Sequence, residues 1–280
     1  MGQPRTHPVP RRRQAVAVTA VPVRAAGMTL GGLAAAGELF AMALEALRRT
    51  WDVRNWFWEF VEQSWFLAKV TMLPSLMVAL PLGATVALQV GDLAGQLGAQ
   101  SATGGAVLVG LVREVAPIAS ALIIAGAGGS AMTSDMGARN IRDELAAMET
   151  MGVNPVHRLV TARMWAAGLI SSMLAPLVIL SGAVGGFVFN VLLQGVTPGA
   201  YFDGALGLLR VSDIVVTLGK SFLFGLIAAV VACHMGMKCE RSPVGVGRAV
   251  NRATVIAFML VFAFNYVITT VYFVAFPPKL

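Results

Sequence analysis

The sequence predicts an all-helical integral membrane protein with five transmembrane helices. An interfacial amphipathic helix precedes them, and an aqueous helix lies between the second and the third. Of the 280 residues, 57% are hydrophobic and only 12% are charged, against roughly 25% charged in an average soluble domain. Several apolar runs of 20 or more residues can each cross a hydrocarbon core of about 30 Å. The charged residues fall between these runs, which is typical of membrane-spanning chains.

Residues 1–27 are predicted to form a disordered, basic cytoplasmic tail. They hold Arg11–Arg13 and several prolines but lack the apolar core of a signal peptide. From residue 28 to residue 50, apolar side chains recur at helical spacing without a continuous apolar run, so this helix should lie along the membrane surface. The recurring apolar residues are Leu33, Phe40, Leu44 and Leu47.

Four of the five tryptophans follow this helix: Trp51, Trp56, Trp58 and Trp65. Indole rings prefer the headgroup level of a bilayer. Residues 28–64 are therefore predicted to be an interfacial helix followed by an aromatic elbow.

Residues 65–280 should form the membrane domain. We place its five crossings at Trp65–Val90, Gly105–Ala131, Ala166–Leu193, Ile214–Met235 and Ala253–Phe276. Pro74 and Pro81 are expected to kink the first crossing.

The distribution of positive charge predicts the orientation. The segment between the second and third crossings and the loop before the fifth hold Arg139, Arg142, Arg158, Arg163, Lys238, Arg241, Arg248 and Arg252. Only Arg210 and Lys279 fall on the opposite side. Since cytoplasmic loops carry the excess of Lys and Arg, the N-terminus should be cytoplasmic and, after five crossings, the C-terminus outside.

The segment Thr133–Arg163 reads as an aqueous helix at about 135–155. Thr133, Ser134 or Asp135 can cap its start, and Gly152 and Pro155 should stop it. Its apolar stripe would be Ile141, Leu145 and Met148, and Arg139 could pair with Asp143 four residues later. Acidic residues in this helix would be repelled by anionic lipid, which favours a soluble protein partner over a membrane surface.

Three ionisable residues fall inside apolar runs: Arg113, Glu114 and Lys220. Ionisable groups at such depth cost at least about 2.5–3.5 kcal/mol each on insertion scales, so they should face a cavity or a partner rather than lipid. Lys220 is the natural partner of Glu114 in a helix bundle. Two interpretations remain open, a polar site in a transport cavity and a structural ion pair.

The glycine-rich stretch around Gly126, Gly128 and Gly129 indicates close helix packing or a hinge. No strand precedes it and no lysine of a phosphate-binding loop follows, so it is not a nucleotide-binding loop.

Other functional classes find no support in the sequence. The net charge of +7 is explained by membrane topology rather than by nucleic acid. Cys233 and Cys239 are interpreted as free thiols, and the three histidines lack metal-ligand spacing. No nucleophile–base arrangement is legible, so no catalytic residue, resident metal or cofactor is expected in this chain.

An ordered series of motifs runs from about Trp51 to the C-terminus. It includes Arg113-Glu114-Val-Ala-Pro117, Gly137-Ala138-Arg139, Met151-Gly152-Val-Asn154-Pro155, Asp213 followed by Lys220-Ser221-Phe222, and Gly245-Val-Gly247. The series resembles the MlaE (YrbE) family, the permease subunits of lipid-transporting ABC importers or exporters. The insert and its ending look most like the actinobacterial YrbE subunits of Mce transporters. Ser242-Pro243-Val244 departs from the Gly-Ala-Glu-like sequence that is frequent in the family.

The resemblance implies an inner-membrane permease that pairs with a second YrbE-type permease, identical or different. It also implies two cytoplasmic ATPase subunits that bind ATP and Mg, MCE-domain proteins on the outer side, and a lipid cavity between the permeases near Glu114. By the same resemblance, residues 135–155 are the coupling helix seated in the ATPase. The residues assigned to coupling are Asp135, Arg139, Arg142, Asp143, Glu144, Met148, Met151, Asn154 and Pro155.

Two other functions are compatible with a charged membrane bundle. An ion-coupled secondary transporter would use Arg113, Glu114 and Lys220, although no inverted repeat is visible and five crossings divide poorly into halves. A membrane scaffold would use the insert only to recruit a partner.

Overall fold

The computed structural model describes residues 21–51, 56–98, 103–199, 201–203 and 209–275. Residues 1–20 of the predicted tail lie outside these ranges, as does Lys279, whereas residues 21–27, also predicted to be disordered, are helical. The chain divides into two units, Met1–Phe40 and Ala41–Leu280. The first helix, α1 (Val21–Arg48), begins in the first unit and ends in the second. The second unit contains all the other described helices.

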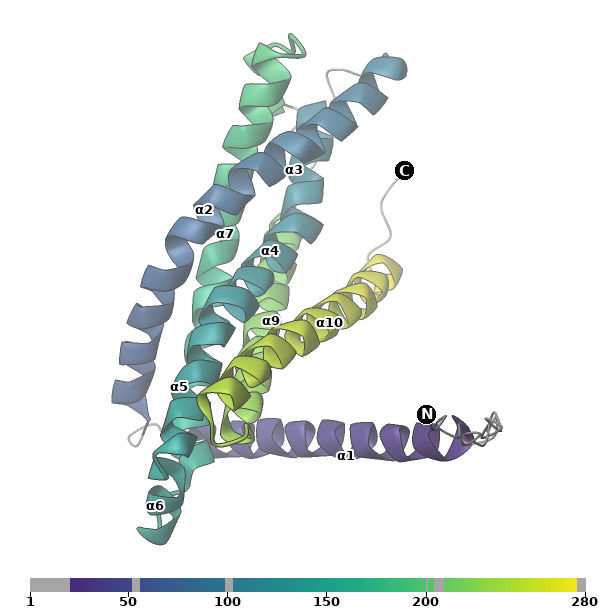
Figure 1. Ribbon diagram of the computed structural model, residues 1–280. Helices are drawn as coiled ribbons and strands as arrows, with labels where there is room; N and C mark the ends of the chain where they lie inside the picture. Colours follow the sequence, from purple (N-terminus) through teal and green to yellow (C-terminus); the bar gives the residue numbers. More distant parts are fainter. Residues whose placement is uncertain (1–20, 52–55, 99–102, 200, 204–208, 276–280) are drawn as a thin grey trace, which may run out of the picture. The chain divides into compact units, whose positions relative to one another are not determined.

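The described residues form helices and no strand, as the sequence predicts (Figure 1). After α1 and a short 3₁₀ turn, Arg49–Trp51, come α2 (Phe57–Gln96), α3 (Thr103–Gly110), α4 (Ala116–Ile123), α5 (Gly129–Ile141), α6 (Glu144–Thr150), α7 (Thr161–Leu192), α9 (Val211–Met237) and α10 (Pro243–Ala275). Three π-helical turns, Leu111–Val115, Ile124–Gly128 and Val156–Val160, join helices into longer rods.

Five of these described rods are long and apolar enough to cross a membrane: Phe57–Gln96, Thr103–Ile141, Val156–Leu192, Val211–Met237 and Pro243–Tyr272. The predicted number of crossings is therefore confirmed, but three of the rods are much longer than predicted. At 1.5 Å per residue the first rod is about 60 Å long, twice a hydrocarbon core. The tryptophans Trp58 and Trp65 belong to its first turns and are exposed.

The contact between α2 and α7 depends on small side chains. Every fourth residue of α2 from Leu67 to Gly91 is buried, namely Leu67, Thr71, Ser75, Ala79, Gly83, Ala87 and Gly91. A Cβ built on Gly83 would lie 1.9 Å from the carbonyl oxygen of Gly182, and one on Gly185 would lie 2.1 Å from that of Leu80. The two backbones thus touch directly, which is how membrane helices gain packing contacts without a hydrophobic driving force.

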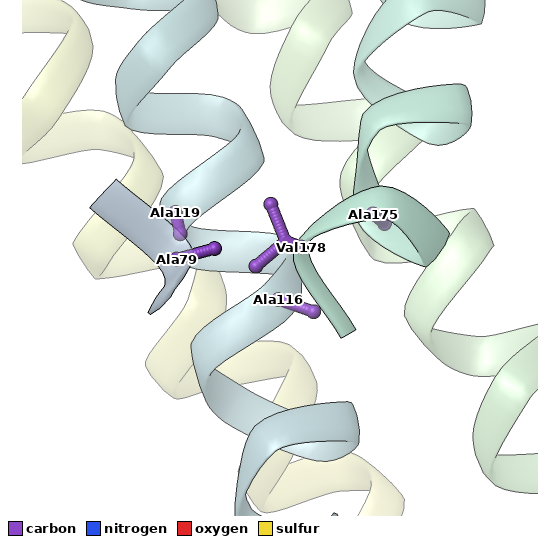
Figure 2. Packing of buried hydrophobic residues seen from close by; sticks show 5 residues of the cluster. All are labelled: Ala79, Ala116, Ala119, Ala175 and Val178. Carbon is purple, nitrogen blue, oxygen red and sulfur yellow. The ribbon is translucent and has the colours of Figure 1, made fainter. Parts of the chain in front are cut away.

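The same use of small residues continues into the centre of the bundle. Figure 2 shows Ala79 of α2, Ala116 and Ala119 of α4, and Ala175 and Val178 of α7 packed against one another. α4 therefore packs closely against α2 and α7. This packing holds the position of the π-helical turn Leu111–Val115, which directly precedes α4.

The predicted helix at 135–155 is wrong in its extent. α5 runs without interruption from Gly129 to Ile141, and the hydroxyl of Thr133 donates to the carbonyl of Ala232 (3.0 Å) instead of capping a helix start. The break comes at Asp143, whose φ of 56° is left-handed, a conformation that Asp tolerates better than most residues. α6 begins only after this break, so Ile141 does not continue the helical stripe of Leu145 and Met148.

The end of α6 follows the prediction. Gly152 has a φ of +77°, which only glycine adopts without strain. The side-chain oxygen of Asn154 accepts the backbone N–H of Val156 at 2.9 Å and starts the next helical rod.

Candidate functional site

Arg113 and Glu114 lie in the π-helical turn Leu111–Val115, where the N–H of Ala116 bonds to the carbonyl five residues back. Pro117 explains why the ladder loosens there, since it has no N–H to offer the preceding turn. Side chains of α9 donate hydrogen bonds to the carbonyl groups that lose their partners in this turn. The Thr217 hydroxyl donates to the carbonyl of Val112 at 2.7 Å, and Lys220 Nζ donates to that of Arg113 at 3.0 Å.

One half of the polar network centres on Asp213, in the first turn of α9. The Arg113 guanidinium binds its carboxylate with both arms, Nε–Oδ1 3.0 Å and Nη2–Oδ2 3.1 Å. The Tyr272 hydroxyl of α10 donates to Oδ1 at 2.7 Å, and the backbone N–H of Arg210 donates to Oδ2 at 3.2 Å. The side chain of Asp213 is fully buried, so these donors replace its hydration shell.

The other half centres on Glu114. Lys220 Nζ lies 3.4 Å from its Oε1, so the structure brings together the two residues expected to pair. From α10, Asn265 donates to Oε2 at 2.9 Å, and the Thr269 hydroxyl donates to Oε1 at 3.0 Å. Lys220 also donates to Thr269 at 2.9 Å. Three rods therefore meet in one hydrogen-bonded group.

This group, which we call the membrane network, consists of Arg113, Glu114, Asp213, Thr217, Lys220, Asn265, Thr269 and Tyr272. Its two cations and two carboxylates balance. The cavity among these side chains is only about 10 Å³, so a lipid headgroup has no room among them. Nevertheless, 24% of the Arg113 side chain and 39% of the Glu114 side chain are exposed.

The sequence reasoning missed the contribution of α10. Asn265, Thr269 and Tyr272 are spaced i, i+4 and i+7 within an apolar run, which places them on one face of a helix. A polar stripe in a membrane helix is itself a signal, because those groups need partners there. In the sequence, Asp213 stands out only as part of a motif.

A second charged group lies about 32 Å further along the same rod, counting 1.5 Å per residue from Glu114 to Asp135. Asp135 binds Arg139 (3.2 Å) and Arg163, and Arg163 also reaches Glu59 of α2 (3.4 Å). Arg139 therefore pairs with Asp135 rather than with Asp143. It also lies 3.8 Å from Glu144. We call Glu59, Asp135, Arg139, Glu144 and Arg163 the inner relay.

The remaining residues assigned to coupling fall into two sets. Asp143 pairs with Arg241, and Arg142 pairs with Glu144 at 2.7 Å. The hydrogen bond to Glu144 raises the pKa of the Arg142 guanidinium, which keeps it charged. Met151 is 71% exposed.

The second set is less exposed than the first and consists of Met148, Asn154 and Pro155. Asn154 donates to Glu45 of α1 at 2.8 Å, and Pro155 is buried. Met148 is half-buried on α6. Beside α6 lies a cavity of about 670 Å³ whose lining includes Met42, Glu45, Leu145, Glu149, Lys238 and Arg241.

The predicted packing glycines sit in or just after the second π-helical turn. A Cβ on Gly128 would lie 2.8 Å from Leu67 of α2, and one on Gly129 would lie 3.8 Å from the Cβ of Ala232. Gly126 has nothing within 4 Å of such a Cβ. Of these three glycines, only Gly128 lies so close to a neighbouring helix that an added Cβ would make a side chain shift.

Comparison with known proteins shows that this chain is similar to permeases of one family. A family model described as Permease MlaE matches residues 60–271. The Haemophilus influenzae intermembrane phospholipid transport system permease protein MlaE is 28% identical over 240 residues, covering 85% of this chain and 92% of that protein. A probable ABC transporter permease protein of Synechocystis is 28% identical over 213 residues, covering 76% and 81%. The match includes the membrane network, except Tyr272, and the whole inner relay except Glu59.

Proposed function

This chain belongs to the MlaE permease family, and on that premise we propose that it is the permease subunit of an ATP-driven ABC lipid transporter of the Mce type. Its cargo would be an amphiphilic lipid. The name of the Haemophilus relative, which specifies phospholipid transport, supports this class of cargo.

The exposed part of the membrane network is the observation that carries the proposal. Charged groups facing lipid cost at least about 2.5–3.5 kcal/mol each on insertion scales. Arg113 and Glu114 are partly exposed, yet the cavity beside them is too small to hydrate them. A second permease, identical or a sister chain, would cover them and enclose a lipid cavity with apolar walls and few polar groups.

The inner end of the chain supports contact with an ATPase. α6 projects beyond the rods, with Glu149 and Met151 exposed. The basic segments predicted to be cytoplasmic lie at this same end, because Asn140 donates to the Cys239 carbonyl at 3.1 Å. We therefore propose that α6 and its flanks seat in cytoplasmic ATPase subunits, which bind ATP and Mg. MCE-domain proteins would meet the opposite end, and the C-terminus would lie outside.

In this mechanism the chain itself hydrolyses nothing. Nucleotide-driven closure of the two ATPases would displace α6, and the rods attached to it would tilt. The cavity between the permeases would narrow and drive the lipid toward or from the outer conduit. Arg113 would meet an anionic headgroup, while Lys220 and Glu114 would hold the walls in register.

Replacing Met148 by glutamate should reduce ATP-dependent lipid transport by at least about tenfold, which corresponds to about 1.4 kcal/mol of lost coupling. A carboxylate in place of a half-buried thioether would disturb the surface that α6 presents. Transport in vesicles and recovery of the ATPase by pull-down would be measured, with Thr150→Ala on the same helix as the control. Wild-type values for both in Met148→Glu would refute the assignment of α6 to coupling.

A further inference from the structure

Arg163, at the start of α7, is the largest side chain that the structure buries completely. Its Nη2 contacts both Asp135 of α5 and Glu59 of α2, and its Nη1 donates to the Leu159 carbonyl at 3.1 Å. Its buried Nε has no hydrogen-bond partner within the described part of the chain. One buried cation is therefore shared by carboxylates of two other helices.

Arg163 joins α5 to α2 and α7, with which α5 has few direct contacts. α2 packs extensively on α7, whereas α5 packs on α9 and α10 and scarcely on α2 or α7. Small residues hold the α2–α7 pair together along its length. α9 joins α5 to this pair indirectly, since a Cβ on Gly236 would lie 2.7 Å from the Thr133 carbonyl of α5 and one on Gly225 would lie 2.5 Å from the Ala167 carbonyl of α7. The direct ionic link between α5 and the pair is the long side chain of Arg163.

The link extends to the exposed tip of the molecule. Asp135 also binds Arg139, which lies 3.8 Å from Glu144 in the first turn of α6. The inner relay is thus a continuous alternation of charges from α6 to α2. Arg163 is its only fully buried side chain, whereas Glu144 and Asp135 are each 41% exposed and Glu59 is 23% exposed.

We propose that Arg163 is the positioning residue that makes α6 and the inner end of α5 move as one body with α2 and α7. The inference rests on the proposed function, because it matters only if a partner displaces α6. A planar guanidinium can hold two carboxylates at once, which a lysine cannot do with the same geometry. Pulling the carboxylates away would leave a buried cation uncompensated, so states with the link broken are disfavoured. Displacement of α6 therefore reaches α2 and α7 instead of being absorbed in the loop.

The distance between α6 and α2 tests this directly. Spin labels would be placed at Ala146 and Glu62, both exposed, after replacement of Cys233 and Cys239. The transporter would be purified with its partners through a tag on this chain and placed in vesicles of phosphatidylethanolamine and phosphatidylglycerol. In the wild type we expect one narrow distance distribution, unchanged by a non-hydrolysable ATP analogue. In Arg163→Met we expect the nucleotide to shift or broaden it.

Three further variants make the result decisive. Arg248→Met removes an exposed pair with Glu240 (3.0 Å), which lies outside the inner relay, and should behave as wild type. Arg163→Lys should fall between wild type and Arg163→Met. If Arg163→Met fails to accumulate, Asp135→Asn, which leaves the contact between Arg163 and Glu59, takes its place with the same expectation.

Two results would overturn the inference: a narrow, nucleotide-independent distribution in Arg163→Met or in its substitute Asp135→Asn, or a nucleotide-dependent distance in the wild type. Absence of an ATPase from the purified wild-type complex would instead overturn the proposed function, and the inference with it.

Discussion

Replacing Lys220 by methionine should abolish lipid transport and lower the free energy of unfolding, by less than the about 3–5 kcal/mol that breaking a fully buried ion pair costs, because 39% of the Glu114 side chain is exposed. Only 4% of the Lys220 side chain is exposed, and it has three acceptors: the Arg113 carbonyl, Glu114 and Thr269. Without it, the membrane network would carry one net negative charge. Thermal unfolding in detergent and transport in vesicles would measure the two effects, with Lys69→Met, an exposed lysine of α2, as the control.

The double variant Lys220→Met/Glu114→Gln separates the two interpretations that the sequence leaves open. Removing both charges restores neutrality, so most of the lost stability should return. If the pair serves the lipid cavity, transport should stay at least tenfold below wild type, a difference of about 1.4 kcal/mol. Wild-type transport in the double variant would mean that Glu114 and Lys220 only brace the helices.

Replacing Gly83 by alanine should be among the most damaging single-methyl changes in the described part of the chain. The new Cβ would lie 1.9 Å from the Gly182 carbonyl oxygen, a backbone atom that cannot move unless α2 and α7 separate. Overpacking in a dense interior costs typically about 1–3 kcal/mol, occasionally more, and a clash between backbones belongs at the upper end. Thermal unfolding in detergent would show the loss.

Gly95, on the same helix, provides the matched control, since a Cβ there meets nothing within 4 Å. Gly95→Ala should be neutral or slightly stabilising, because alanine is the better helix former by about 1 kcal/mol. Equal melting temperatures for Gly83→Ala and wild type would contradict the close approach of the two backbones.

The crossings could be predicted from the sequence because long apolar runs have few alternatives in structure. Their ends could not, since Glu59 and Asp135 look like solvent-exposed residues in sequence yet sit within continuous rods. The break at Asp143 depends on a left-handed backbone and on the ion pair with Arg241, a residue almost a hundred positions away. Helical periodicity carries no information about such a contact.

The candidate site could be predicted in part, because ionisable residues stand out within apolar runs. The depth of Glu114 and Lys220 in apolar runs made each of them need a partner, and the bundle joins them. The pairing of Arg113 with Asp213, and of Arg163 with Asp135 and Glu59, depends on which helices are neighbours. Spacing within one helix favoured a pair between Arg139 and Asp143, but α5 ends at Ile141 and Asp143 pairs with Arg241. Arg139 therefore binds Asp135, four residues in the other direction.

The proposal that this chain is half of a lipid-holding permease pair driven by ATPases can be tested by native mass spectrometry. The complex would be purified in mild detergent through a tag on this chain. We expect two permeases, two ATPase subunits, an MCE-domain protein and retained lipid, with lipid occupancy reduced in Lys220→Met/Glu114→Gln. A chain recovered alone, without ATPase and without lipid, would contradict the proposal.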